Sequence, residues 1–159
     1  KKENGGSAGP LRDGKFSVYE GGVREPFVAR WPGVIPAGTV SHEPAITLDL
    51  FTTSIKLAQG NVPADRPIDG KNILPMLLGK ETSPHDTLYF YKGTNLSALR
   101  QGKWKLHYRK GQPKEKAELY NLHLDVSEKN NIAKNHPEVV VRLIKNFLEF
   151  EESVDVKKL

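Results

Sequence analysis

The residues best suited to chemistry lie in a glycine-rich segment near the amino terminus, residues 9–26. A single lysine, Lys15, directly follows Gly14 there. Glycines let a backbone approach a ligand closely, and a lysine on such a loop is a compact cation suited to an oxyanion. The segment therefore favours an anion-binding loop, although it lacks the spacing and the Lys-Ser/Thr pair of a P-loop. Two charged residues and two conformationally free glycines follow Lys15 in this segment. They are Glu20, Gly21, Gly22 and Arg24.

The histidines and acidic residues predict no metal site within this chain. None of the five histidines pairs with another histidine or a carboxylate at helical metal spacing. His107 and His123 lie on separate predicted strands and could converge, but we expect the histidines to lie on the surface or in turns. Asp69-Gly70 is typical of a turn, and the alternating acidic run of a calcium loop is absent.

A second candidate is the basic segment 103–116, in which Trp104 and Tyr108 stand between lysines and arginines. Basic residues interleaved with aromatic ones can bind nucleic acid or a sulfated polysaccharide. A solvated strand face followed by a loop would give the same pattern. A non-catalytic basic binding module for sulfated glycan or nucleic acid is therefore an alternative hypothesis. The basic residues are Lys103, Lys105, Arg109, Lys110, Lys114 and Lys116.

Composition narrows the classes of protein. The chain has 159 residues, 37% of them hydrophobic, and a net charge of +5. Without any cysteine it cannot form disulfides, a Cys-ligated zinc site or a thiol nucleophile. No apolar run approaches the length of a membrane helix, so we expect no membrane partner. The chain begins at Lys1 rather than Met, and we expect it to be part of a longer protein.

Apolar spacing predicts the elements that position these residues. Residues 27–31 are β-prone and stop at Pro32-Gly33, which predicts a buried strand. Residues 47–58 predict a helix with an apolar stripe, and residues 73–78 predict one or two further helical turns. Residues 87–124 predict an antiparallel meander of about four strands, with Lys105 and His107 on its polar face. The apolar period after Pro137 predicts a final helix packed on one face of the meander.

Segment 9–26 closely resembles a motif of the type I sulfatase (arylsulfatase) family, roughly G-P-L-R-x-G-K-x-x-x-x-E-G-G-[IV]-R-x-P. The W-P-G-x-I-P-x-G motif follows, and four later segments resemble further family motifs in the same order. One departure is Thr52, where proline is usual. The matching segments are residues 9–26, 31–38, 48–53, 69–79, 98–106 and 118–122.

The resemblance implies sulfate ester hydrolysis through a formylglycine nucleophile and a calcium ion. It makes Lys15 the sulfate-contacting, catalytic lysine and Arg24 a second candidate for substrate binding. Glu20 and Arg24 are expected to be scaffold charges that hold the loop, together with Gly14, Gly21 and Gly22 as structural positions.

The departures from the family pattern are equally informative. No serine stands in the C/S-x-P-S/A-R context of the formylglycine motif, and Asn4-Gly5-Gly6 lacks the aspartate of the D-N-G metal motif. The nucleophile and the Ca²⁺ ligands are therefore expected upstream of this chain. We expect the chain alone to be inactive and to bind no metal.

The resemblance also implies the fold class, α/β in the parent and α+β in this fragment. Residues 1–84 are expected to be the end of an alkaline-phosphatase-like α/β domain. Residues 85–159 are expected to be a small domain, a four-stranded antiparallel sheet with a packed C-terminal helix. The expected partners are a sulfate-ester small molecule or a sulfated glycan and the N-terminal part of the same protein, without nucleic acid or membrane. The expected location is secreted, periplasmic or lysosomal.

Overall fold

The structure is a computed structural model, and it describes residues 6–154. The predictions made for Asn4 and Gly5 lie outside the described residues. The chain forms two compact units. The sheet unit consists of the described residues up to Glu25 and from Thr87 onward, and the middle unit consists of Pro26–Asp86. The predicted domains 1–84 and 85–159 stay a prediction, because these units record packing within this chain alone.

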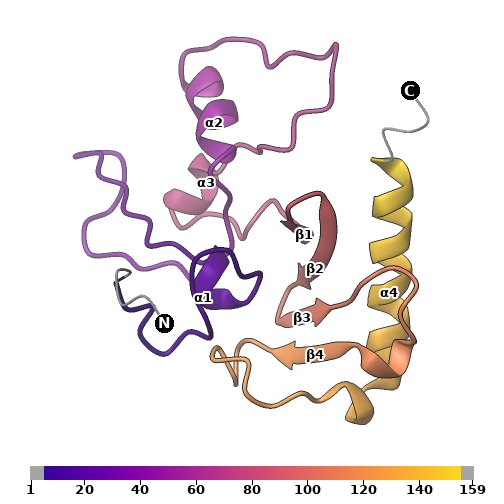
Figure 1. Cartoon of the computed structure of the whole chain (residues 1–159). Coiled ribbons are helices and arrows are strands. Elements are labelled where there is room, and N and C mark those ends of the chain that lie inside the picture. Colours follow the sequence, from indigo (N-terminus) through magenta and orange to yellow (C-terminus); the bar gives the residue numbers. More distant parts are fainter. Residues whose placement is uncertain (1–5, 155–159) are drawn as a thin grey trace. The chain divides into compact units, whose positions relative to one another are not determined.

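A four-stranded antiparallel sheet forms the centre of the sheet unit, with neighbouring strands in sequence order (Figure 1). This confirms the predicted meander. Gly93 and Gly102, in the first two turns, have positive φ angles of 62° and 56°, which glycine adopts without steric cost. The strands are β1 (Thr87–Lys92), β2 (Asn95–Gln101), β3 (Trp104–His107) and β4 (Glu118–Asn121).

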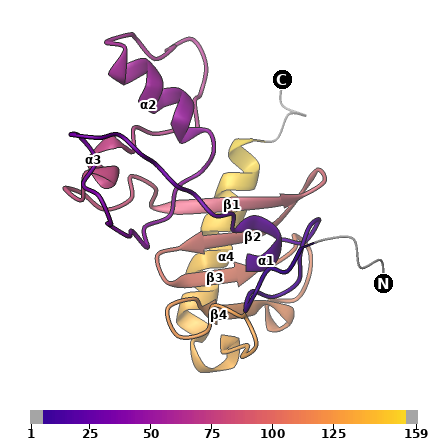
Figure 2. The same ribbon diagram turned by 90° about the vertical axis from the view of Figure 1, so that its left-hand side faces the viewer.

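The helix α4 (Pro137–Ser153) covers one face of this sheet (Figure 2). Its buried side chains Val140, Leu143 and Phe147 join the core of the sheet. Fully burying such a side chain contributes about 1.5–3 kcal/mol. The predicted final helix and its packing are therefore confirmed. Two short 3₁₀ helices, η1 (Lys114–Lys116) and η2 (Ala133–Asn135), complete the connections on either side of β4.

The opposite face of the sheet is covered by the amino-terminal segment and its short helix α1 (Glu20–Val23) (Figures 1 and 2). Strand β3 does alternate, as predicted, but its polar face is not solvated. Lys105 is 0% exposed and His107 is 8% exposed. The prediction that Lys105 and His107 lie on a solvent face is wrong, because a segment more than 80 residues away in sequence packs over them.

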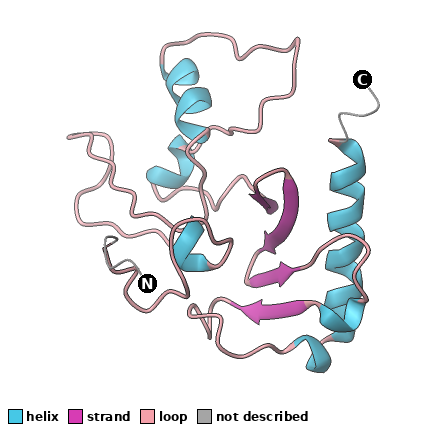
Figure 3. Ribbon diagram, in the orientation of Figure 1, coloured by secondary structure: helices cyan, strands magenta, loops and turns pink. Residues whose placement is uncertain are grey.

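The middle unit contains two helices, α2 (Asp49–Leu57) and α3 (Leu74–Leu77), joined by long loops (Figure 3). Both helices were predicted. Asp49 is buried and connects three parts of the unit, because its carboxylate accepts hydrogen bonds from the backbone N–H of Ile46 and Lys71 and contacts His85 Nε2 at 2.8 Å. His85 lies in a loop, which the turn alternative of the prediction allows, but its side chain is 6% exposed, so the surface alternative is wrong for it.

Residues 27–31 form no strand in the middle unit. Val28 is 88% exposed and Phe27 is 53% exposed, so the prediction of a buried strand is wrong for this chain. A strand requires a neighbouring strand to pair its backbone, and no strand is assigned within Pro26–Asp86.

Candidate functional site

Lys15 lies on a compact loop that we call the Lys15 loop, residues 12–24. The backbone closes on itself through two hydrogen bonds, from Ser17 N–H to Gly14 O at 3.0 Å and from Gly21 N–H to Arg12 O at 2.9 Å. Lys15 is exposed, and its Nζ lies 5.1 Å from the centre of the Phe16 ring. The loop therefore presents one lysine ammonium from a closed backbone framework.

Gly21 and Gly22 allow α1 to approach the rest of the Lys15 loop. A Cβ on Gly21 would lie 2.5 Å from Arg12 O, and a Cβ on Gly22 would lie 2.2 Å from Ser17 O. Real Cβ atoms do not approach carbonyl oxygens so closely. A Cβ on Gly14 would meet nothing within 4 Å. The predicted structural role thus has a steric basis at Gly21 and Gly22, whereas at Gly14 it stays a prediction.

Two residues that flank Lys15 have left-handed backbone angles. Asp13 has a φ of 65° and Phe16 has a φ of 73°. Aspartate adopts this region more readily than most residues, whereas for a bulky side chain such as that of Phe16 it is unusual and costs on the order of 1–3 kcal/mol. Phe16 is 82% exposed, so burial of its ring does not offset this cost. The conformation of the loop must be imposed by contacts elsewhere in the sheet unit.

Those contacts centre on four charged or titratable residues that we call the buried ion cluster: Glu20, Lys105, His107 and Glu128. Lys105 Nζ lies 2.8 Å from Glu20 Oε1 and 3.3 Å from Glu128 Oε1. His107 Nε2 lies 2.8 Å from Glu128 Oε1. Glu20, on α1, is thereby joined to the sheet and to the loop that follows β4.

Glu128 receives hydrogen bonds from both sides of this junction. Its Oε2 accepts the backbone N–H of Glu20 at 2.5 Å. Burial by itself would raise the pKa of Glu128, but the hydrogen bonds from His107 and the Glu20 backbone, with the charge of Lys105, outweigh burial and lower it. Glu128 is therefore held as a carboxylate inside the protein.

A second layer of aromatic and charged side chains surrounds the cluster. The guanidinium of Arg12 lies 3.8 Å from the centre of the Tyr19 ring, and Tyr19 stacks on His107 with ring centres 4.3 Å apart. The hydroxyl groups of Tyr19 and Tyr120 both donate to Glu118 Oε2. Burial and the hydrogen bond to Glu118 raise the pKa of Tyr19 to about 12, so Tyr19 remains a neutral donor.

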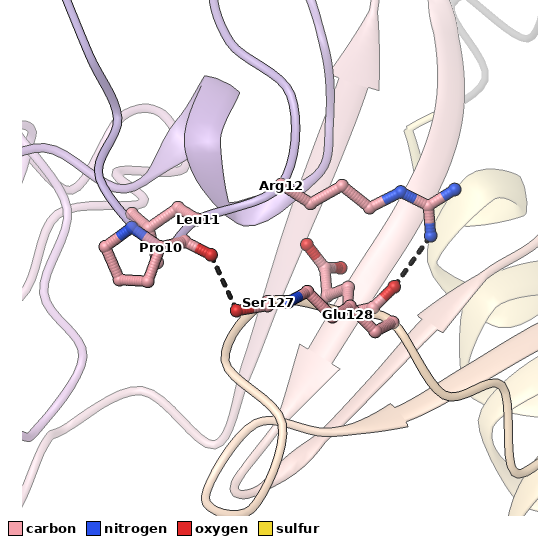
Figure 4. A pocket seen from close by; sticks show the side chains of 6 residues that line it. Pro10, Leu11, Arg12, Ser127 and Glu128 are labelled. Atoms are coloured by element: carbon pink, nitrogen blue, oxygen red, sulfur yellow. Dashed lines mark hydrogen bonds between the residues drawn. The ribbon is translucent and has the colours of Figure 1, made fainter.

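A shallow pocket of about 410 Å³ lies beside this layer, between residues 10–12 and residues 127–129 (Figure 4). Arg12 donates to Glu128 O at 2.7 Å, and Ser127 Oγ donates to Pro10 O at 2.6 Å. Because Arg12 is engaged in these contacts, the pocket offers no unused guanidinium. Lys15 does not line the pocket, so we do not place the candidate site there.

The structure brings together some predicted residues and reveals others. Arg24 Nη1 lies 3.7 Å from Glu20 Oε2, and both belong to the same framework as Lys15. Roles of these residues in binding or catalysis stay predictions. Sequence reasoning missed Lys105 and Glu128 as partners of Glu20, and it placed His107 on the surface or in a turn. The alternation of apolar and polar residues in β3 indicated a second, polar face. A single sequence contains no signal for the segment that covers this face.

The basic segment 103–116 is not a single solvated face. Lys105 is buried in the ion cluster, and Lys110 pairs with Glu151 at 3.2 Å. A small pocket of about 180 Å³ near Arg109 and Lys116 also contains the acidic Glu118. Nothing in this arrangement favours the binding-module hypothesis, which stays untested.

Within residues 6–154, no group of three or more His, Asp or Glu side chains is arranged to hold a metal ion. No helix within these residues has the length and apolar character needed to cross a bilayer.

Comparisons with known proteins identify the class. The family model described as N-sulphoglucosamine sulphohydrolase, C-terminal, matches residues 11–153. N-acetylgalactosamine-6-sulfatase of Canis lupus familiaris is 47% identical over 104 residues, which are 65% of this chain and 20% of that protein.

Solved structures extend the comparison to the fold. A sulfatase from Pseudoalteromonas sp. superposes with a TM-score of 0.76 at 23% identity, covering 92% of this chain and 34% of that one. The protein Ps i-CgsB, solved in complex with k-i-k-neocarrahexaose, has a TM-score of 0.75 at 29% identity, covering 89% of this chain and 32% of that one. The expected fold class is confirmed.

The fold and these matches define the C-terminal part of a sulfatase. This chain belongs to the family described as N-sulphoglucosamine sulphohydrolase, C-terminal. Its match covers about a fifth of the length of the canine N-acetylgalactosamine-6-sulfatase.

Proposed function

We propose that the protein containing this chain hydrolyses sulfate esters and that Lys15 binds the sulfate group. The observation that carries the proposal is the family match over residues 11–153, which includes the whole Lys15 loop. The exposed ammonium of Lys15 on a closed backbone framework supports it. A positive charge held in place stabilises an anion more effectively than a mobile one, because no reorganisation is needed.

The rest of the catalytic machinery is proposed to lie in other parts of the protein. This chain contains no cysteine, and among residues 6–154 no three His, Asp or Glu side chains are grouped so that they could hold a metal ion. A formylglycine would supply the nucleophile, and Ca²⁺ would be held by upstream residues. The 159-residue chain alone is expected to be inactive. Its own contribution is to orient and neutralise the sulfate oxygens through Lys15, with Arg24 as a second candidate contact.

The proposed substrate class is a sulfate ester, either a sulfated glycan or a smaller sulfate. A structurally similar protein was solved with k-i-k-neocarrahexaose, which supports a sugar substrate for this protein as well. The proposed location is secreted, periplasmic or lysosomal, as for the family in general.

The test uses the full-length protein produced together with its formylglycine-generating enzyme. Turnover of an aryl sulfate and of a sulfated disaccharide is measured for the wild type and for Lys15→Ala. Removing one charged donor to the reacting group should lower kcat by roughly 10²–10³-fold. Lys145→Ala, a change at a lysine that is 74% exposed on α4, is the control and should retain turnover. Wild-type turnover in Lys15→Ala would exclude the proposed role.

A further inference from the structure

The buried ion cluster joins the Lys15 loop to the sheet. These contacts bear on how Lys15 is held in the candidate site. We infer that Lys105 and Glu128 are positioning residues, which hold Lys15 where it can bind sulfate. The inference rests on the proposed function of Lys15. It assigns a role in the reaction to two residues that have no expected contact with the substrate.

Lys105 and Glu128 contact two different groups of Glu20, its side chain and its backbone. Lys105 Nζ binds the side-chain oxygen of Glu20 at 2.8 Å, while Glu128 Oε2 accepts the backbone N–H of Glu20. Lys105 and Glu128 are 0% exposed and Glu20 is 2% exposed. A charge buried without its partner is strongly unfavourable, so these three residues favour one position of α1 relative to the sheet.

The position of α1 in turn determines the position of Lys15. The Gly21 N–H binds Arg12 O, and the Gly21 and Gly22 contacts leave no gap between α1 and the loop backbone. Asp13 and Phe16 keep left-handed angles on either side of Lys15. At a bulky residue such as Phe16, a left-handed angle persists only where the surroundings determine it. If α1 leaves the sheet, the strain around Lys15 can relax and its ammonium loses its defined location.

The pair formed by Arg24 and Glu20, of which only Arg24 is open to solvent, is a weaker candidate for the same task. Its atoms are 3.7 Å apart, and the Arg24 side chain is 46% exposed. Ion pairs open to water contribute little. The buried partners of Glu20 are therefore assigned the positioning role.

The first measurement is hydrogen exchange of the full-length protein, read by mass spectrometry in peptides from residues 10–24. Lys105→Met should accelerate exchange there by about 10²-fold, because it removes the cation between two buried carboxylates. Peptides from α4 should exchange as in the wild type. Lys145→Met is the matched control on an exposed helix position and should change neither region. Wild-type exchange in residues 10–24 of Lys105→Met overturns the inference.

The second measurement asks whether the junction acts through Lys15. The value of kcat/KM is determined for the wild type, Lys15→Ala, Lys105→Met and the double variant. If Lys105 acts by positioning Lys15, the losses of kcat/KM caused by the two substitutions overlap. Adding Lys15→Ala to Lys105→Met should then lower kcat/KM by less than about tenfold. Additive losses would mean that Lys105 affects activity by another route, and they also overturn the inference.

Two outcomes separate this inference from the proposed function. If Lys15→Ala is harmless in the wild type, the sulfate-binding role fails and the positioning role fails with it, whereas faster exchange would still show that the cluster holds the loop. If Lys105→Met accelerates exchange in α4 as well, the milder Glu20→Gln replaces it. This variant keeps the size of the side chain but removes its charge, and unchanged exchange in residues 10–24 then overturns the inference.

Discussion

Glu128 shows how one side chain can connect distant parts of a chain. It has a left-handed φ of 49° and is fully buried. Its oxygens accept from the His107 ring and from the Glu20 backbone, and Lys105 lies close to the same carboxylate. Since these contacts lower its pKa, folding stabilises the charged form of Glu128 over the protonated one.

This predicts a pH dependence of stability. A carboxylate with a lowered pKa in the folded state stabilises the protein above its ordinary value of about 4.3, and the contribution is lost as the pH falls through the folded value. Glu128→Gln should therefore lower the free energy of unfolding at pH 7 by about 1–3 kcal/mol. The difference in the free energy of unfolding between Glu128→Gln and the wild type should become smaller below pH about 4.

Urea denaturation of the 159-residue chain at pH 7, 5 and 3.5 measures this gap. Glu149→Gln, at a side chain that is 63% exposed on α4, is the control. It should stay within about 0.5 kcal/mol of the wild type at each pH. A gap for Glu128→Gln that stays constant or widens in acid would contradict the prediction.

At the scale of residues, the sequence identified only the side of the junction that belongs to the Lys15 loop. Lys15, Glu20 and the two glycines could be singled out because their motif is local. Their partners could not, because Glu20 and Lys105 are 85 positions apart. A single sequence contains no signal for so distant a pair, and a lysine on a strand is ordinarily solvated.

At the scale of elements, α1 and the Lys15 loop fit together only because Gly22 has no side chain. A Cβ there would lie 2.2 Å from Ser17 O and 2.6 Å from Gly14 O, both of which are backbone atoms that cannot rotate away. Gly22→Ala should therefore destabilise the sheet unit by about 1–3 kcal/mol, as overpacking usually does.

The measurement is the free energy of unfolding, combined with the rate of protease cleavage within residues 10–24. Gly14→Ala serves as the control in the same loop, because a Cβ at Gly14 has open space, and it should be close to neutral. Equal stability of the two variants would refute the steric account of the glycine pair.

Elements with local signals were predicted well and elements that need distant partners were not. The meander and α4 were found because period-two and helical spacing are visible in the sequence. The predicted strand at residues 27–31 has the right composition but no strand beside it in the middle unit. In α2 the buried residues are Asp49, Thr52 and Thr53, while Phe51 of the apolar stripe is 50% exposed.

At the scale of the whole molecule, the middle unit exposes several large apolar side chains. Large exposed apolar surfaces mark sites where another surface packs. Because the part of this chain that matches a curated relative covers only about a fifth of that relative, we expect the rest of the protein to cover them. The exposed residues include Phe27 at 53%, Val28 at 88%, Trp31 at 40% and Phe51 at 50%.

Hydroxyl-radical footprinting of the isolated chain and of the full-length protein tests this expectation. Oxidation of Trp31 and Phe51 should fall by about tenfold or more in the full-length protein, since burial excludes the radical as it excludes water. Leu124, which is 86% exposed in the sheet unit, is the internal reference and should react similarly in both. Equal oxidation of Trp31 and Phe51 in the two proteins would mean that this surface stays open.

The long sequence separation across the buried ion cluster has a consequence for folding. The antiparallel strands pair with their immediate neighbours in the chain, whereas the bond from the Glu20 backbone to Glu128 spans 108 positions. Local pairings form quickly, and closing a long loop carries a larger entropic cost. During synthesis the Lys15 loop leaves the ribosome before its carboxyl-terminal partners exist. The Lys15 loop cannot form these contacts until β3 and the loop after β4 have been synthesised. The candidate sulfate-binding group should therefore be among the last parts of the sheet unit to reach its final position.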